Sequence, residues 1–232
     1  MPVALVTGAS KGLGLALGTA LAERGWDLVV DARDAAVLEA AARRLSAPGT
    51  RVRALPGSVT DPEHRAALVA EAWALGGLDL LAANASALGA APLVPLARHP
   101  LDGLREALET NVVAALGLVQ ESLGLLRSAP AGAVLGISSD AAVEAYGTWG
   151  GYGSSKAALD QLLAVLAVEE PGLRVWAVDP GDMRTELYRA AVPLDDDSGR
   201  PLPAAVVPAL LRLLDARPPS GRYAAPALLE RS

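Results

Sequence analysis

Tyr152 and Lys156 are the residues of this chain best suited to proton transfer. They are four positions apart in a segment with helical periodicity, so their side chains would share one face of a helix. A free tyrosine hydroxyl ionises near pH ~10, and a nearby ammonium group lowers the pKa of a phenol. A tyrosine with a lowered pKa is suited to general acid–base work. Because this spacing is common on helices, the hypothesis also depends on Ser138 and Ser139, which end the preceding apolar run.

Lysine and asparagine are rare in this chain, and arginine supplies nearly all the other positive charge. Besides Lys156, lysine occurs only as Lys11, in a glycine-rich segment. Asn84 follows an apolar run, and Asn111 lies in a long helical pattern. Arginine cannot replace lysine where a compact, rotatable ammonium group is required. These positions therefore indicate roles in chemistry rather than general solvation.

A glycine-rich segment joins the first apolar run to the first helical pattern. It reads Thr7-Gly8-Ala9-Ser10-Lys11-Gly12-Leu13-Gly14. Glycines allow a tight turn and close approach of backbone to phosphate, and a helix N-terminus offers free N–H groups. A strand before the glycines and a helix after them are the context that such a site requires, so the segment predicts dinucleotide binding.

The second apolar run ends in Asp31-Ala32-Arg33-Asp34. An acid at this point would bind the ribose hydroxyls of NAD, whereas a nearby arginine would favour the 2′-phosphate of NADP. If Ala32 holds the discriminating position, Arg33 stacks on the adenine and reaches the phosphate, and Lys11 adds a second positive charge. We therefore favour NADP(H), with NAD(H) bound through Asp31 as the alternative.

Strand and helix patterns alternate along the whole chain and would position these residues. The expected strands are 2–7, 27–31, 50–55, 78–83, 133–139 and 173–178, with a further strand at 222–225. The expected helices are 12–24, 34–45 with Asp34 as N-cap, one opening at Asp61-Pro62-Glu63 and running to about 75, 101–126, 151–169 and 204–216.

This alternation predicts an α/β fold, a Rossmann-like doubly wound parallel sheet with helices on both faces. We expect one domain over residues 1–232. The segments 86–100 and 180–203 are expected to be irregular substrate loops, because long loops in compact domains are often functional lids. Ligands of open α/β sheets bind beyond the carboxyl ends of the strands, where all these motifs begin.

Composition argues against several classes of protein. The net charge of −6 disfavours nucleic-acid binding, and the absence of cysteine excludes disulfides and thiolate metal sites. His64 and His99 are far apart in sequence and are both expected to be exposed, so we expect no metal site and no histidine-based triad. Neither a signal peptide nor a membrane-spanning run is visible, which predicts a soluble cytoplasmic protein.

The motifs together resemble the short-chain dehydrogenase/reductase family, single-domain type, over essentially the whole chain. The matching elements are the glycine-rich segment from Thr7 to Gly14, Asn84-Ala85, Asn111, Ser139, Tyr152-x-x-x-Lys156 and Pro180-Gly181-x-x-x-Thr185. The resemblance implies that Tyr152 protonates the alkoxide formed as hydride arrives, and that Lys156 lowers the Tyr152 pKa and holds the nicotinamide ribose.

The resemblance also implies roles for the other matching residues. Ser139, thirteen residues before Tyr152, would hydrogen-bond the substrate carbonyl, with Ser138 as the second candidate. Asn111 would bend its helix and hold a water that relays protons to Lys156. Pro180, Gly181 and Thr185 would contact the nicotinamide end of the cofactor, and Gly8, Ser10, Lys11, Gly12, Leu13, Gly14, Arg33, Asn84 and Ala85 would contact the rest of it.

The chain departs from the family pattern at four places. Ala83 and Ser86 flank Asn84-Ala85 where the family has Asn and Gly, Ser58 replaces the Asp that touches adenine, and Asp179 stands where Asn is common. The C-terminus lacks the usual glycine-rich turn. These departures lie at positions that the resemblance links to cofactor affinity and tetramer contacts.

The function expected from these observations is NADPH-dependent reduction of a ketone or aldehyde, or the reverse oxidation of an alcohol. A small carbonyl or alcohol substrate and a homodimer or homotetramer are expected, with no nucleic acid or membrane as partner. Asp182 and Glu186 would disfavour an acidic substrate if they faced inward. The alternatives are a non-catalytic nucleotide-binding scaffold or sensor, an NAD-dependent alcohol dehydrogenase, and a dehydratase or epimerase.

Overall fold

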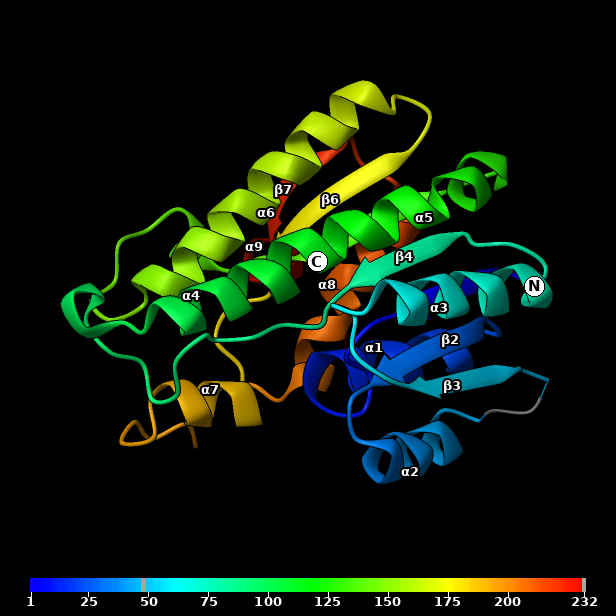
Figure 1. Cartoon of the computed structure of the whole chain (residues 1–232). Coiled ribbons are helices and arrows are strands. Elements are labelled where there is room, and N and C mark those ends of the chain that lie inside the picture. Colours follow the sequence, from blue (N-terminus) through cyan, green and yellow to red (C-terminus); the bar gives the residue numbers. More distant parts are fainter. Residues whose placement is uncertain (47–48, 231–232) are drawn as a thin grey trace.

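The computed structural model describes residues 1–46 and 49–230 and contains a seven-stranded parallel sheet (Figure 1). The strand order is β3-β2-β1-β4-β5-β6-β7. The strands are β1 (Val3–Val6), β2 (Asp27–Ala32), β3 (Val52–Pro56), β4 (Leu80–Ala83), β5 (Ala133–Ile137), β6 (Arg174–Asp179) and β7 (Gly221–Ala224). The order reverses between β1 and β4, which creates the crevice where such sheets bind ligands. The predicted Rossmann-like fold is confirmed.

Helices cover both faces of the sheet (Figure 1). One face carries α1 (Gly12–Glu23), α2 (Ala35–Leu45), α8 (Pro203–Ala216) and α9 (Ala225–Leu229). The other carries α3 (Pro62–Leu75), α5 (Ala114–Ser128) and α6 (Gly150–Glu169). The remaining elements are α4 (Leu101–Leu108), α7 (Glu186–Ala191), the π-helical turn η2 (Glu109–Val113) and the 3-10 turns η1 (Leu96–Arg98) and η3 (Asp140–Ala142).

The apolar strands form two cores because successive side chains of a strand point to opposite faces. In β1, Ala4 and Val6 lie in the core beneath α1 and α8, whereas Val3 and Leu5 lie in the core beneath α3 and α5. Every residue of β1 is buried, as expected for a central parallel strand. The central strands are therefore fixed from both sides, and their carboxyl ends are held in place.

Predicted helix boundaries agree with the structure where the capping signals are local. Asp34 caps α2 by accepting a hydrogen bond from the backbone N–H of Val37. Asp61 caps α3 by accepting from the N–H of Glu63, with Pro62 at the first helical position. Both N-terminal signals are confirmed.

The prediction of one long helical stretch over 101–126 is confirmed, except that the stretch contains a π-turn and ends two residues later. The segment forms α4 and α5, separated by η2, and α5 continues to Ser128. A π-turn contains one extra residue per turn and therefore re-aims the side chains that it carries. Asn111, where the resemblance implies a local bend of the helix, lies in this turn and is buried.

The prediction that 180–203 is irregular is wrong in part, because residues 186–191 form α7. Thr185 caps this helix by accepting a hydrogen bond from the N–H of Tyr188 at 3.1 Å. In Figure 1, α7 lies at one end of the sheet, apart from the helices that cover its faces. Within residues 1–46 and 49–230, no helix is long and apolar enough to cross a membrane.

Candidate active site

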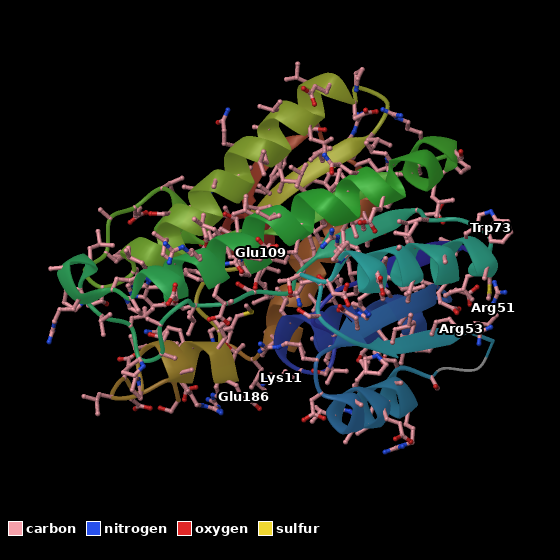
Figure 2. All side chains as sticks on the ribbon, viewed as in Figure 1. Lys11, Arg51, Arg53, Trp73, Glu109 and Glu186 are labelled. Carbon is pink, nitrogen blue, oxygen red and sulfur yellow. The ribbon has the colours of Figure 1, made fainter. Side chains whose placement is uncertain are left out.

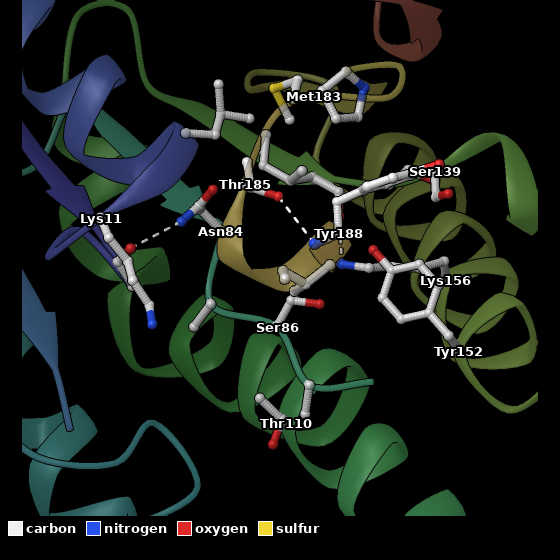
Figure 3. A pocket seen from close by; sticks show the side chains of 18 of the residues that line it. Lys11, Asn84, Ser86, Thr110, Ser139, Tyr152, Lys156, Met183, Thr185 and Tyr188 are labelled. Carbon is white, nitrogen blue, oxygen red and sulfur yellow. Dashed lines mark hydrogen bonds between the residues drawn. The ribbon is translucent and has the colours of Figure 1, made fainter. Parts of the chain in front are cut away.

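A pocket of about 760 Å³ lies at the carboxyl ends of β1 to β6. Its walls come from the segments that follow these strands and from the N-terminal half of α6. Lys11 and Asn84 lie at one end of the pocket, and Ser139, Tyr152 and Lys156 lie at the other (Figure 3). The structure therefore brings the two predicted groups of residues into one cavity.

The glycine loop requires its glycines for two different reasons. Gly8 and Gly12 have positive φ values of 64° and 57°, which favour glycine. Gly14 is required by close packing, because a Cβ there would lie 2.5 Å from the Gly8 carbonyl oxygen and from Asn84 Nδ2. Lys11, the N-cap of α1, makes no side-chain capping bond, so the N–H groups at this helix end remain available to an anion.

Asn84 and Thr7 clamp the glycine loop to the end of β4. Asn84 Nδ2 donates to the Thr7 carbonyl at 2.7 Å and to the Gly8 carbonyl at 3.3 Å. Thr7 Oγ1 accepts from the backbone N–H groups of Asn84 and Ala85 at 3.0 and 2.9 Å. The side chain of Asn84 therefore positions the loop, and Ala85 joins it at the pocket wall.

Asp31 is occupied by contacts within the protein. It is 1% exposed, and its Oδ1 accepts from the Gly8 N–H at 2.8 Å. Its Oδ2 lies 3.2 Å from His64 Nε2, and the His64 side chain is only 8% exposed. The prediction that His64 is an exposed residue is therefore wrong, because this carboxylate draws the imidazole inward.

Ala32 and Arg33 follow Asp31 at the adenosine end of the pocket, and both line it. Asp31 also lines the pocket, and each of its two oxygens already has one partner within the protein. Ser58, at the position where the family has an adenine-contacting Asp, lies on the same wall, and its hydroxyl is 2.8 Å from that of Thr60.

Tyr152 and Lys156 lie side by side on α6, and both are buried. The Lys156 Nζ lies 5.5 Å from the centre of the Tyr152 ring and donates to the Ile137 carbonyl at 2.7 Å. A Cβ on Gly153 would lie 2.4 Å from the Ala141 carbonyl oxygen, so this glycine allows α6 to approach the segment after β5. The close approach places Tyr152 beside that segment.

Burial shifts the pKa values of both groups, because the protein interior disfavours the charged form of each. Burial lowers the pKa of Lys156 to about 8, although the Asp160 carboxylate opposes this change. Burial, together with the carboxylates of Asp140 and Asp179, raises the pKa of Tyr152 to about 12. The expected lowering of the Tyr152 pKa is therefore wrong for this structure, because burial dominates and the lysine donates to a backbone carbonyl.

The two candidate serines have different environments. Ser139 Oγ donates to Asp140 Oδ1 at 2.9 Å and accepts from the Ala141 N–H at 3.2 Å, which caps the short turn η3. Ser138 is 1% exposed, and its hydroxyl has no hydrogen-bond partner among the described residues. Both line the pocket.

Asn111 holds the segment after β4 against α6. Its Nδ2 donates to the Ala87 carbonyl at 2.9 Å and to Ser155 Oγ at 2.8 Å, and its Oδ1 accepts from the Ala87 N–H at 2.8 Å. Both ends of the amide therefore have protein partners, and these are Ala87 and Ser155 rather than Lys156. The neighbouring Thr110 lines the pocket.

Pro180, Gly181 and Thr185 all line the pocket after β6. Gly181 has a φ of 73°, and its N–H donates to Asp179 Oδ1 at 2.9 Å. Burial raises the pKa of Asp179, and hydrogen bonding opposes this change only in part. Asp179 thus fixes the turn that follows β6.

The segment that carries α7 is held by a small polar network. Arg200 pairs with Asp182 and with Asp195, the second at 2.9 Å, and its guanidinium lies 4.3 Å from the centre of the Tyr188 ring. The Tyr188 hydroxyl donates to Asp195 at 2.6 Å. Asp182 lines the pocket, whereas Glu186 is exposed and pairs with Lys11.

His99 was predicted to be exposed, and this prediction is wrong. Both of its ring nitrogens are buried without a hydrogen-bond partner in the described part of the chain. The ring packs on Gly151, where a Cβ would lie 2.4 Å from His99 Cε1. Glycine at the start of α6 thus makes room for this ring next to Tyr152, a contact that no local sequence signal indicates.

Some acidic residues of the pocket were not predicted as site residues, and two of them lie near Tyr152. Asp140 and Asp179 follow β5 and β6 and line the pocket beside the catalytic candidates. Their position after buried strands was the signal that could have identified them. Trp149 packs edge-on against Tyr152, with ring centres 5.7 Å apart, and forms part of the same wall.

Known proteins resemble this chain in sequence and in structure. Residues 2–194 match the family model for short chain dehydrogenase. A benzil reductase from Saccharomyces cerevisiae that forms (S)-benzoin is 34% identical over 195 residues, which cover 81% of this chain and 73% of that protein. A short chain dehydrogenase from Shigella flexneri, solved in complex with NADP, superimposes with a TM-score of 0.90 at 27% identity. The superposition covers 97% of this chain and 96% of that one.

One relative is much longer than this chain. A glycine betaine reductase from Emericella nidulans is 35% identical over 188 residues. These residues cover 80% of this chain but only 15% of that protein. The similarity therefore concerns one small part of the longer relative.

The close packing of Gly14 predicts a large effect of a single methyl group. We expect Gly14→Ala to reduce the free energy of unfolding by about 1–3 kcal/mol, because the Cβ would meet a backbone carbonyl. Gly124→Ala is the matched control. Gly124 lies in α5 with nothing within 4 Å of a Cβ, so this change should stabilise by about 0.5–1 kcal/mol. Denaturant unfolding measures both, and a neutral Gly14→Ala would contradict the packing described.

The buried ammonium of Lys156 predicts a specific pH dependence of stability. Its pKa is about 8 in the folded protein and 10.5 as the ordinary value, so between these values the unfolded chain binds the extra proton. Stability should therefore rise by about 2–3 kcal/mol from pH 8 to 10. Lys156→Met should lose this rise, and Lys11→Met, at an exposed position, should keep it. Equal pH dependence in all three proteins would contradict the burial of a charged lysine.

Proposed function

This chain belongs to the short-chain dehydrogenase family of NAD(P)-dependent oxidoreductases, and we propose that it reduces a ketone or aldehyde with NADPH, or oxidises the alcohol in reverse. The observation that carries the proposal is the buried pair Tyr152 and Lys156 in a pocket that also contains the glycine loop. A proton donor and a phosphate-binding loop in one cavity are what hydride transfer to a carbonyl requires.

The residues of the pocket fit a dinucleotide. The loop after β1 has two glycines with positive φ, and α1 begins there without a side-chain cap. Gly8, Ser10, Lys11, Leu13 and Arg33 line this end. They would hold the phosphates and adenosine, with Gly12 and Gly14 shaping the loop. Asn84 and Ala85 would line the middle, and Pro180, Gly181 and Thr185 the nicotinamide end. When bound, the cofactor supplies the hydride.

NADP(H) is favoured over NAD(H) because of the contacts of Asp31. Its two oxygens bind Gly8 and His64, which leaves Ala32 and Arg33 to face the adenosine end. An arginine there suits a 2′-phosphate. The similar protein from Shigella flexneri was solved with NADP, which supports the same choice.

Tyr152 would deliver the proton and remain protonated until it does so. Its raised pKa keeps the hydroxyl neutral at physiological pH, as a general acid must be. Lys156 would hold the nicotinamide ribose and restore part of the lost solvation of the phenolate once it forms. Ser139 would donate to the substrate oxygen, and donors aimed at developing negative charge can contribute several kcal/mol. Asn111 would act by positioning, since it ties the segment after β4 to α6.

A neutral carbonyl compound is the substrate class that the pocket suits best. Trp149, Leu187 and Val192 give it apolar walls. Asp140 and Asp179 lie beside the proton donor and would repel an anionic substrate. The segments 86–100 and 180–203 would form the substrate loops of a single domain.

The exposed apolar residues of the two long helices support a homodimer or homotetramer. Val113 and Leu116 are 50% and 38% exposed, and Val165 and Val168 on α6 are 41% and 80% exposed. Such residues on neighbouring helices suit burial against a second copy. A cytoplasmic location stays a prediction.

Other functions on the same fold differ in measurable ways. A scaffold or sensor would bind the cofactor without turnover, and a dehydratase or epimerase would turn over without net cofactor oxidation. An NAD-dependent alcohol dehydrogenase would prefer the cofactor that lacks the 2′-phosphate. The buried tyrosine–lysine pair favours an enzyme over a scaffold or sensor.

The proposal predicts that Tyr152→Phe abolishes reduction and spares cofactor binding. The change removes the proton donor and keeps the ring that packs on Trp149, so we expect the reduction rate to fall at least about 10²-fold, the lower range for general acid catalysis. NADPH oxidation with a panel of neutral ketones and aldehydes gives the rate, and titration with NADPH gives the affinity. Tyr146→Phe, at a pocket-lining tyrosine without a lysine partner, is the control. Undiminished turnover by Tyr152→Phe would contradict the mechanism.

A further inference from the structure

Lys11 and Glu186 form an ion pair that joins two walls of the cofactor groove. Lys11 lies on the glycine loop at the start of α1, and Glu186 is the first residue of α7, which is 175 positions away in the sequence. Figure 2 shows the two side chains meeting between these helices. The adjacent residues also approach each other, since a Cβ on Gly12 would lie 3.8 Å from Thr185 Cγ2.

This pair has no role in the proton transfer described above. Lys11 lines the pocket, whereas Glu186 lies outside its wall. The two side chains are 60% and 66% exposed, so the pair is a surface ion pair rather than part of the core. The pairing lowers the pKa of Glu186, which is therefore fully charged at neutral pH.

The pair places the Glu186 carboxylate beside Lys11, which is one of the two cations available to a 2′-phosphate. Arg33 is the other, and no carboxylate within residues 1–46 and 49–230 forms an ion pair with it. Lys11 can bind a phosphate oxygen only by leaving Glu186 or by sharing its ammonium with it. In either case the carboxylate also repels the incoming phosphate.

We propose that Glu186 is a specificity-determining residue that reduces the preference of this protein for NADPH over NADH by competing with the 2′-phosphate for Lys11. The inference rests on the proposed function, because it assumes that the pocket binds a nicotinamide dinucleotide. Glu186 touches neither substrate nor the proton donor, so its effect is on cofactor binding. Substrate turnover at saturating cofactor should be unaffected.

The expected size follows from the exposure of the pair. Exposed ion pairs change binding or stability by a factor of roughly 1.5 to 5 (~0.2–1 kcal/mol at ~1.4 kcal/mol per tenfold). We therefore expect Glu186→Gln to raise the ratio of the NADH to the NADPH dissociation constant by this factor at low ionic strength. The gain should shrink as salt is added, because salt screens exposed charges.

The experiment is a calorimetric titration of five proteins with NADPH and with NADH. They are the wild type, Glu186→Gln, Lys11→Gln, the double variant and Glu39→Gln. Glu39 pairs with Arg43 at a comparably exposed site on α2 and controls for the change in net charge. Lys11→Gln should lower the NADPH preference, and Glu186→Gln should have no further effect once Lys11 is replaced. Glu39→Gln should match the wild type.

Several results would overturn the inference while leaving the proposed function intact. One is an unchanged cofactor preference in Glu186→Gln, and another is the same gain in the absence of Lys11. A third is weaker NADPH binding by Glu186→Gln, which would mean that the pair holds α7 over the bound cofactor. A wild type that binds neither cofactor would overturn the proposed function and this inference with it.

Discussion

The buried ammonium group of Lys156 is the constraint on which the rest of the site depends. Its Nζ donates to the Ile137 carbonyl and lies 5.5 Å from the centre of the Tyr152 ring. Taking a charge out of water costs several kcal/mol unless partners are fixed in place. The lowered pKa of Lys156 reflects that cost. Tight packing of α6 against β5 fixes these partners in place. A Cβ on Gly136 of β5 would lie only 2.3 Å from a Leu163 methyl group of α6.

Three polar side chains stabilise the walls of the pocket through hydrogen bonds within the protein. Asp31 ties the glycine loop to β2, Asn84 ties it to β4, and Asn111 ties the segment after β4 to α6. Each satisfies backbone groups that burial would otherwise leave unpaired. Because these bonds form within the protein, the walls are already in position to receive a cofactor and a substrate.

Local patterns in the sequence were sufficient to predict the alternation of strands and helices along the chain. They also identified the pair Tyr152 and Lys156, because residue spacing and glycines act locally. Contacts between distant segments were not predictable in this way. The ring nitrogens of His99 are buried because Gly151 leaves room for the ring, and α7 interrupts 180–203 because Thr185 caps it. The raised pKa of Tyr152 depends on burial by several elements at once, which spacing does not encode.

The transfer of deuterium from NADPH tests the central claim most directly. NADPH labelled at either face of C4 would be incubated with the protein and a neutral ketone that it reduces, and the alcohol analysed by mass spectrometry and NMR. The account predicts deuterium on the carbinol carbon from one of the two labelled cofactors, in amounts equal to the cofactor oxidised. Alcohol formed without deuterium from either cofactor, or turnover without cofactor oxidation, would contradict it.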